Sequence, residues 1–147
     1  TDYIINVLKE CYKAGHLQVA IQHEGETLYG FAMLFIHPHH KAAYLHKIFV
    51  YKHFRGNGLG TNILNSLTAS GKTINLICPD SKIGFYENNG FNYVQSFEMP
   101  DSDNFKLSKG LYAGLSVMTN STDSLEAPIF FLNDDDLRII AGFKQKI

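Results

Sequence analysis

The chain has 147 residues, of which 45% are hydrophobic and only 18% charged, a composition typical of one folded domain and not of a disordered chain. Its formal net charge of −1 argues against nucleic acid or an acidic membrane surface as a partner. No apolar run is long enough to span a bilayer, and no secretion signal is recognisable, so neither a membrane nor an export function is indicated.

The first half of the chain predicts one helix followed by three strands. The expected elements are a helix over residues 3–13 and strands over 17–22, 28–36 and 44–50. Ile4, Leu8 and Cys11 recur at helical spacing, and Gly15 is placed to end that helix. Alternating apolar residues mark the first strand, and β-branched and aromatic residues mark the third. Because short turns join the strands, we expect an antiparallel meander.

The second half of the chain alternates between helices and strands. The expected elements are a helix from Leu59 that ends near Gly71, a strand over 74–78, a helix over 82–89, and strands over 91–97 and 111–118. Together with the first half, this order predicts a mixed α+β sheet with helices over its faces. After a polar linker at 119–126, a short strand over 129–132 leads to a last helix, for which Asn133 is the expected cap.

A glycine loop, Arg55 to Gly60 (RGNGLG), lies between the third strand and the following helix. Glycine lets several backbone N–H groups point toward one place, and the start of the helix adds unsatisfied N–H groups and the positive end of its dipole. Arg55 contributes a guanidinium that suits phosphate oxygens. The loop therefore predicts a ligand with a di- or triphosphate-like group.

Three kinds of phosphate loop compete for this segment. A Walker A loop ends in Gly-Lys-Ser/Thr, but Gly60 is followed by Thr61 and Asn62. A dinucleotide fingerprint needs a third glycine at position 61 and an opening βαβ unit, and the sequence has neither. Arg55, Gly58 and Gly60 do satisfy a third pattern, Arg-x-x-Gly-x-Gly. The loop is therefore interpreted as a pyrophosphate site that serves neither ATP nor a nicotinamide dinucleotide.

The segment from Leu45 to Leu67 resembles the signature of the Gcn5-related N-acetyltransferase (GNAT) superfamily. Farther on, Pro79 to Phe91 is similar to the second motif of that family, in which a helix carrying Phe-Tyr ends at Gly-Phe. The resemblance covers roughly residues 16–118. It implies the GNAT fold, in which a mixed, mostly antiparallel central sheet of about six to seven strands is flanked by helices.

The resemblance also implies an activity. The implied activity is acyl-CoA-dependent N-acyl transfer, with acetyl-CoA as the cosubstrate implied by the family. In this reaction a primary amine attacks the thioester directly in a ternary complex. The acceptor would be a small-molecule amine or a protein amino group. The alternative is a non-catalytic acyl-CoA-binding sensor or interaction domain of the same fold. Tyr86 favours the enzyme, whereas the lack of an evident acidic base favours the sensor.

For the cosubstrate, the resemblance implies that the third strand pairs with the pantetheine arm and that the glycine loop holds the pyrophosphate. The residues carried over for cosubstrate binding are Ile48, Phe49, Val50, Arg55, Gly56, Asn57, Gly58, Leu59, Gly60, Thr61 and Tyr86. Tyr86 is also the expected general acid, because the tetrahedral intermediate collapses more easily if the thiolate leaves as a thiol. The general base is left open among His46, His53, Glu87 and water, with His46 as the named candidate.

Cysteines and histidines do not indicate a metal. Cys11 and Cys78 lie in apolar surroundings without metal-type spacing, so we expect buried, reduced thiols and a cytoplasmic protein. His37, His39 and His40 gather in a predicted turn without a cysteine or acidic partner at ligand spacing. We expect a solvated hairpin tip there.

Both ends of the chain depart from the family pattern. An acetyltransferase domain is expected over residues 1–120, but the strand with which this family normally opens is missing. Residues 121–147 form an extension whose segment 129–145 resembles such an opening. We expect this extension to supply the missing strand and helix within the chain or to exchange them with a neighbour in a homodimer. An ordinary extension that packs elsewhere is the alternative.

Overall fold

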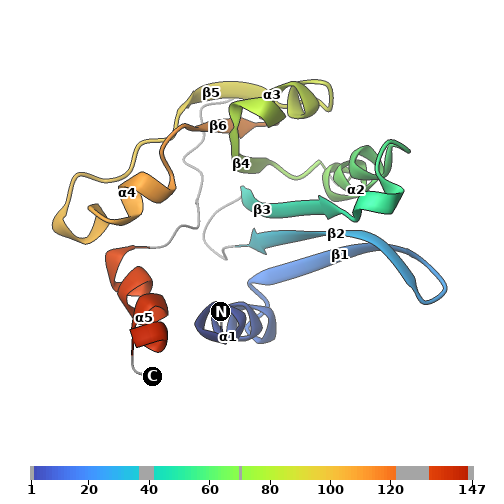
Figure 1. The fold of residues 1–147 in the computed structure, drawn as a ribbon. Helices are drawn as coiled ribbons and strands as arrows, with labels where there is room; N and C mark the ends of the chain where they lie inside the picture. Colours follow the sequence, from blue (N-terminus) through green and yellow to red (C-terminus); the bar gives the residue numbers. More distant parts are fainter. Residues whose placement is uncertain (1, 37–41, 70, 122–132, 146–147) are drawn as a thin grey trace.

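The structure is a computed structural model that describes residues 2–36, 42–69, 71–121 and 133–145. The six strands that these residues form make one sheet in the order β1-β2-β3-β4-β6-β5 (Figure 1). The strands are β1 (Leu17–Glu24), β2 (Thr27–Ile36), β3 (Ala43–Val50), β4 (Ile74–Pro79), β5 (Asn92–Ser96) and β6 (Leu115–Thr119). Neighbouring strands are antiparallel except β3 and β4, which run parallel. The predicted fold class, a mixed and mostly antiparallel sheet flanked by helices, is confirmed.

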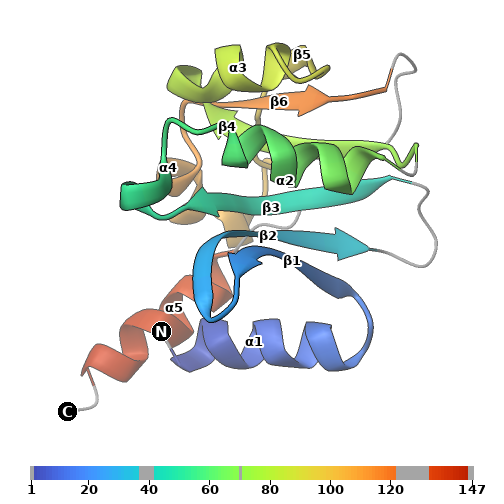
Figure 2. The same cartoon turned by 90° about the vertical axis from the view of Figure 1, so that its right-hand side faces the viewer.

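Helices connect and flank these strands. The α-helices are α1 (Asp2–Lys13), α2 (Leu59–Thr68), α3 (Asp80–Glu87), α4 (Ser108–Leu111) and α5 (Asp134–Gln145), and two short 3-10 helices are η1 (Lys52–Phe54) and η2 (Asp103–Phe105). Figure 2 shows α2 in front of the sheet, with α1 below β1. Within the part of the chain that the structure describes, no helix is both long and apolar enough to cross a membrane.

The main core lies between the sheet and helices α2 and α3. Its buried residues are Ala32, Leu34, Ala43, Leu45, Ile63, Leu64, Ile74, Leu76, Cys78, Tyr86, Phe91 and Met118. Ile63 and Leu64 are the buried residues of α2, and burial of an aliphatic side chain of this size contributes about 1.5–3 kcal/mol. The same packing holds α3 against the sheet through Tyr86. The core thus fixes the two helices that carry the sequence motifs.

A smaller cluster lies on the opposite face of the sheet, because consecutive residues of a strand point to opposite faces. Its members are Leu17, Phe35 and Tyr44, with Leu8, Cys11, Met33 and Ile77 packed against them. Gly15, at a φ of 80°, ends α1 as predicted. Cys78 is buried as expected, but Cys11 is only partly buried. The expectation for Cys11 was wrong because α1 lies at the surface and contains no fully buried residue.

Two element boundaries differ from the sequence prediction. The last strand of the sheet begins at Leu115 and not at Leu111, because Ser108–Leu111 forms the short helix α4. Helix α3 begins at Asp80 and not at Lys82, so the Asp80 carboxylate lies in the first turn, where the helix dipole favours an anion. The histidines predicted at a hairpin tip and the strand predicted over 129–132 lie outside the described residues.

The last helix begins where it was predicted. The side-chain oxygen of Asn133 accepts a hydrogen bond from the backbone N–H of Asp136 (2.9 Å), and the Asp136 carboxylate accepts one from the N–H of Asn133 (3.0 Å). This reciprocal pair satisfies N–H groups that the helix itself leaves unbonded. The hydroxyl of Tyr3 in α1 donates to the same carboxylate (2.5 Å), and α5 lies beside α1 of the same chain (Figure 1).

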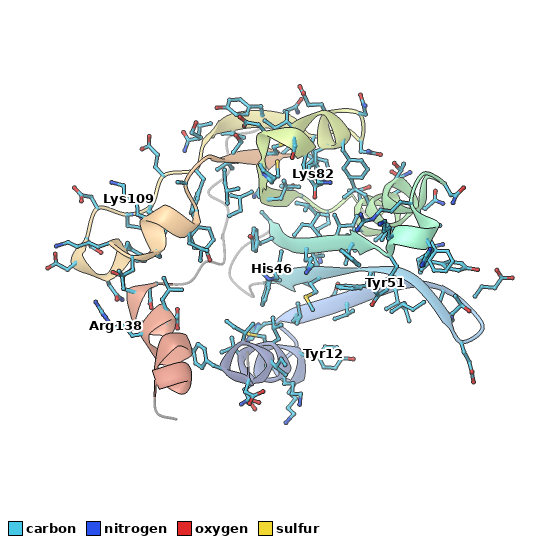
Figure 3. The ribbon with its side chains drawn as sticks, in the orientation of Figure 1. Tyr12, His46, Tyr51, Lys82, Lys109 and Arg138 are labelled. Atoms are coloured by element: carbon cyan, nitrogen blue, oxygen red, sulfur yellow. The ribbon has the colours of Figure 1, made fainter. Side chains whose placement is uncertain are left out.

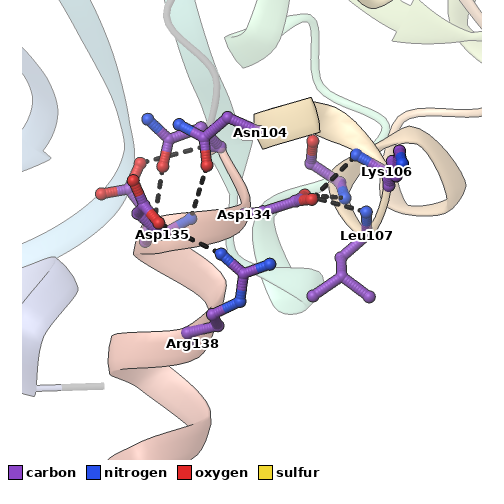
Figure 4. A network of polar contacts seen from close by, with 9 residues as sticks. Asn104, Lys106, Leu107, Asp134, Asp135 and Arg138 are labelled. Carbon is purple, nitrogen blue, oxygen red and sulfur yellow. Dashed lines mark hydrogen bonds and ion pairs between the residues drawn. The ribbon is translucent and has the colours of Figure 1, made fainter. Parts of the chain in front are cut away.

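A buried carboxylate ties α5 to α4 (Figure 4). Asp134 has no exposed surface, and its oxygens accept hydrogen bonds from the backbone N–H groups of Lys106, Leu107 and Ser108, each at 2.8 Å. Burial alone would raise the pKa of this carboxyl, but these hydrogen bonds lower it below its usual value. The contact therefore caps α4 from the C-terminal helix. Replacement of an opening strand by residues 121–147, or their exchange with a neighbour, stays a prediction.

Candidate active site

Strands β3 and β4 separate soon after they meet. They pair only at Ala43 with Ile74 and at Tyr44 with Asn75, after which β4 pairs with β6 alone. Among the described residues, the edge of β3 that faces β4 therefore has no strand partner from Leu45 to Val50. We call this opening the strand split. A sheet interrupted in this way offers backbone N–H and C=O groups to an extended ligand.

The glycine loop lies at the end of β3 beside the strand split. Gly56 and Gly58 have φ angles of 85° and 74°, a region that only glycine enters without strain. Gly58 precedes α2, and the N–H of Asn62 makes the first helical hydrogen bond, to the Gly58 carbonyl (3.0 Å). The N–H groups between them therefore face out of the helix end, as an anion site requires.

Two side chains brace this loop from within. The Nε of Arg55 donates to the carbonyl of Val50 (2.8 Å), and the amide nitrogen of Asn57 donates to the carbonyl of Phe54 (3.3 Å). The guanidinium carbon of Arg55 lies 5.3 Å from the centre of the Phe49 ring. Arg55 thus adds a positive charge next to the loop, at the end of the strand split.

The second motif packs directly against the first. A Cβ placed on Gly60 would lie 3.3 Å from Cζ of Phe85, so α3 and the start of α2 are in contact. Tyr86 follows Phe85 and is 8% exposed, with its ring edge-on to Phe85 (5.1 Å) and to Phe91 (5.7 Å). Gly90, at a φ of 89°, turns the chain so that the N–H of Phe91 donates to the Tyr86 carbonyl (3.0 Å). The motif residues therefore hold Tyr86 in one position.

Two buried phenol groups near the strand split, those of Tyr44 and Tyr86, have raised pKa values. Burial, with a smaller contribution from the Cys78 thiol, raises the pKa of Tyr86 to about 12. Burial also raises the pKa of Tyr44, with added contributions from Tyr112 and Tyr86. Tyr44 and Tyr86 thus remain protonated at neutral pH. The sequence prediction did not anticipate that Tyr44 and Tyr112 influence each other. Tyr44 lies at the start of β3 and Tyr112 at the end of α4, and no local pattern shows that these two segments interact.

His46 occupies an irregularity in β3. Met33 of β2 pairs with Lys47 and Leu34 pairs with Leu45, which leaves His46 as the extra residue of a β-bulge. A bulge of this kind turns two consecutive side chains toward one face of the sheet. Figure 3 shows His46 on the side of the sheet that α1 occupies.

The surroundings of His46 lower its pKa. Its ring lies edge-on to Phe35 (5.5 Å) and near Tyr44 (6.1 Å), and part of the side chain remains exposed. Desolvation by these rings is the first cause of the lowered pKa, and the positive charge of Lys47 is the second. The imidazole is therefore mostly neutral at pH 7 and able to accept a proton.

The remaining residues predicted for the site differ in where their side chains lie. Ile48 and Val50 pack against the main core, so Phe49 between them points to the opposite face. His53 lies in η1 and Glu87 at the end of α3, and both are exposed. Among the described residues, no three His, Cys, Asp or Glu side chains are arranged to hold a metal ion.

The acetyltransferase (GNAT) domain family matches residues 13–93 of this chain, which is more than half of its 147 residues. The chain therefore belongs to the GNAT acetyltransferase family. No curated protein matches its sequence significantly. Both sequence motifs, Leu45 to Leu67 and Pro79 to Phe91, lie within the matched range. The same range contains β3 and β4, the strands that border the strand split.

Solved structures share the fold at low sequence identity. An acetyltransferase from Thermus thermophilus is 15% identical, with a TM-score of 0.60 over 79% of this chain and 71% of that chain. The PaiA N-acetyltransferase from Thermoplasma acidophilum, in complex with coenzyme A, is 17% identical, with a TM-score of 0.56 over 80% and 69%. A Bacillus subtilis acetyltransferase, also in complex with CoA, is 16% identical, with a TM-score of 0.54 over 78% and 81%.

Proposed function

We propose that this protein is an acyl-CoA-dependent N-acyltransferase that transfers an acetyl group from acetyl-CoA to a primary amine in a ternary complex. The observation that carries the proposal is the strand split, with the glycine loop at its end and Tyr86 beside it. Two structures of the same fold, from T. acidophilum and B. subtilis, hold coenzyme A. That likeness supports coenzyme A as the carrier of the acyl group here.

In this proposal the cosubstrate enters the strand split as an extended chain. The backbone of Ile48, Phe49 and Val50, on the edge of β3 that lacks a strand partner, pairs with the amide groups of the pantetheine arm. The N–H groups from Gly56 to Thr61 bind the pyrophosphate, together with the guanidinium of Arg55. Binding thus uses backbone groups along the open edge of β3 and at the start of α2, and the Val50 carbonyl already accepts a hydrogen bond from Nε of Arg55.

The transfer itself is one addition followed by one elimination. The nitrogen of the neutral amine attacks the thioester carbon, and the carbonyl oxygen takes up the electron pair. When that pair returns, the new C–N bond remains and the C–S bond breaks, so coenzyme A leaves as a thiolate. The excess proton on nitrogen is taken by His46 or by water. Holding amine and thioester together supplies much of the rate, because it removes the entropy cost of their encounter.

The raised pKa of Tyr86 refines its expected role. With a tyrosine pKa of about 12 and a thiol pKa of about 8.5, full transfer of the phenol proton to the thiolate would cost on the order of 5 kcal/mol. A hydrogen bond from the phenol to the sulfur carries no such cost and strengthens as negative charge develops there. We therefore assign to Tyr86 the stabilisation of the leaving thiolate by a donated hydrogen bond.

Release of free thiol from acetyl-CoA in the presence of a panel of amines tests the proposal. The wild-type protein should release coenzyme A with at least one amine, and mass spectrometry should find that amine acetylated. Replacing Tyr86 by Phe should lower kcat by roughly 10- to 1,000-fold and change the KM for acetyl-CoA much less. Tyr93→Phe, at a side chain that is 50% exposed on β5, is the matched control.

Two results would contradict the proposal in different ways. Equal kcat values for the wild type and Tyr86→Phe would remove Tyr86 from the mechanism. Binding of acetyl-CoA, seen by calorimetry, without thiol release for any amine would instead favour an acyl-CoA sensor of the same fold.

A further inference from the structure

Lys47 belongs to a surface that is both aromatic and cationic. Its Nζ lies 5.6 Å from the centre of the Phe49 ring, and the guanidinium carbon of Arg55 lies 5.3 Å from the same centre. The Phe49 ring also contacts Phe31 (5.8 Å) and Tyr51 (5.2 Å). We call these five residues the cationic aromatic surface. Figure 3 labels Tyr51, which belongs to this surface and directly follows the last residue of β3, and His46, which lies in the first half of that strand.

In the part of the chain that the structure describes, no acidic side chain forms an ion pair with Lys47 or Arg55. The ion pairs within 4.0 Å among the described residues are Lys13–Glu10, Lys106–Asp103 and Arg138–Asp135. Neither Lys47 nor Arg55 takes part in one of them. A pyrophosphate at the glycine loop would neutralise Arg55, whereas Lys47 would keep its positive charge. Lys47 is therefore available to an anionic group of a second ligand.

The position of Lys47 connects that charge to the acceptor. Tyr86 packs in the main core, whereas His46 and Lys47 point to the other face of the sheet. A thioester in the strand split would thus have Tyr86 on one side and Lys47 on the other. An amine that gives its proton to His46 approaches from the side of Lys47, and the remainder of the acceptor then passes over Phe49.

We propose that Lys47 selects acceptors in which a carboxylate lies close to the primary amine, and that the rings of the cationic aromatic surface favour an aromatic or other apolar side group on the same molecule. α-Amino acids with such side chains form the acceptor class. This inference rests on the proposed N-acyltransferase function. The ammonium of Lys47 donates a hydrogen bond to the carboxylate, and the side group packs against Phe49 and Phe31.

The same surface excludes another class of amine. A polyamine would bring additional positive charges next to Lys47, and like charges placed together repel. Discrimination therefore has an attractive part, the carboxylate, and a repulsive part, the extra ammonium. Both parts depend on the charge at position 47.

Three acceptors separate these contributions. Phenylalanine and 2-phenylethylamine share the ring and the primary amine and differ by the carboxylate, and spermidine carries extra ammonium groups without a ring. Thiol release from acetyl-CoA is measured with each. For the wild type, kcat/KM for phenylalanine should exceed that for 2-phenylethylamine by about tenfold, and spermidine should be the poorest acceptor.

Charge variants at position 47 test the residue itself. Lys47→Met should reduce the preference for phenylalanine over 2-phenylethylamine to about twofold or less, Lys47→Arg should restore most of it, and Lys47→Glu should improve spermidine relative to phenylalanine. Lys106→Gln removes the same charge from a side chain that is 76% exposed and paired with Asp103, so its selectivity should match the wild type.

The outcomes distinguish this inference from the function on which it rests. Acetylation of 2-phenylethylamine or spermidine at least as efficient as that of phenylalanine would overturn the inference and leave N-acetyl transfer intact. A preference for phenylalanine that survives in Lys47→Met would overturn the role of Lys47. Absence of thiol release with every amine would overturn the proposed function, and the acceptor class would fall with it.

Discussion

Gly60 and Phe85 meet so closely that a Cβ at position 60 would lie 3.3 Å from Cζ of the phenyl ring. Gly60 belongs to the glycine loop, and Phe85 immediately precedes Tyr86. This contact therefore joins the loop of the proposed pyrophosphate site to the helix that carries the proposed hydrogen-bond donor. Because the neighbouring atom belongs to a side chain and not to the backbone, an added methyl group would displace the ring by a few tenths of an ångström and would not break the fold.

Replacing Gly60 by Ala should weaken cosubstrate binding more than it weakens the fold. The displaced ring moves α3 relative to α2, so the KM for acetyl-CoA should rise several-fold, on the order of 1 kcal/mol. The higher helix propensity of alanine offsets part of the loss in stability. In the double variant with Phe85→Leu, the KM should move back toward the wild-type value. A KM that does not respond to either change would show that this contact does not position the site.

Gly30 in β2 is much less tolerant than Gly60. A Cβ there would lie 2.5 Å from the carbonyl oxygen of Phe49, which is backbone and cannot rotate away. Gly30→Ala should therefore lower the free energy of unfolding by about 2–4 kcal/mol, measured by urea denaturation. The control is Gly84→Ala in α3, where a Cβ meets nothing within 4 Å. That variant should be more stable by about 0.5–1 kcal/mol, and equal effects at the two positions would contradict the packing described here.

Stability should fall at alkaline pH, and Tyr86 should account for part of the fall. A tyrosine in the unfolded chain has a pKa of about 10, whereas burial raises that of Tyr86 in the folded protein to about 12. Because the folded pKa is the higher one, the stabilisation is complete below pH 10 and is lost as the pH rises through 12. Each such group contributes a slope of about 1.4 kcal/mol per pH unit in this window. Urea denaturation between pH 9 and 11 should show a smaller slope for Tyr86→Phe than for Tyr93→Phe.

Asp134 should hold α5 in place only while it is ionised. Its pKa is lowered by the hydrogen bonds from Lys106, Leu107 and Ser108 despite its burial. The stabilisation is therefore present above the usual carboxyl pKa of about 4 and is lost as the pH falls through the lower pKa of the folded state. Asp134→Asn, which has one acceptor oxygen in place of two, should speed amide hydrogen exchange in α4 and α5. Asp135→Asn, at an exposed partner of Arg138, is the control, and equal exchange in both variants would contradict the capping role.

The sequence predicted the glycine loop and the end of α3, because interactions between residues close together in the chain determine both. Glycines at 56 and 58 require positive φ angles, and the apolar spacing of α2 places its first turn directly behind them. The turn at Gly90 likewise fixes how Phe91 closes α3. Each of these relationships spans a few residues, so the sequence alone contains the information.

Other features depend on contacts between distant segments, and the sequence did not reveal them. The bulge at His46 lies within a segment, residues 44–50 (YLHKIFV), that has the composition of an ordinary strand, and only the pairing with β2 shows which residue is extra. Asp134 lies in the first turn of α5, where an acidic residue needs no partner beyond the helix dipole, but its carboxylate caps N–H groups near Leu107, 27 positions away. The error at the start of β6 has the same origin, because α4 is capped from outside its own segment.

The strand split has a further consequence for how the protein opens. Because Ala43 with Ile74 and Tyr44 with Asn75 are the only residue pairs across this boundary in the described chain, the sheet consists of two separately paired ladders, β1-β2-β3 and β4-β6-β5. Amide hydrogens exchange when their own ladder opens, so the two ladders can show different exchange rates and act as separate cooperative units. A ligand that forms hydrogen bonds to both edges of the split would join the two ladders into one cooperative unit. The amide hydrogens of the whole sheet would then exchange at the rate of the slower ladder.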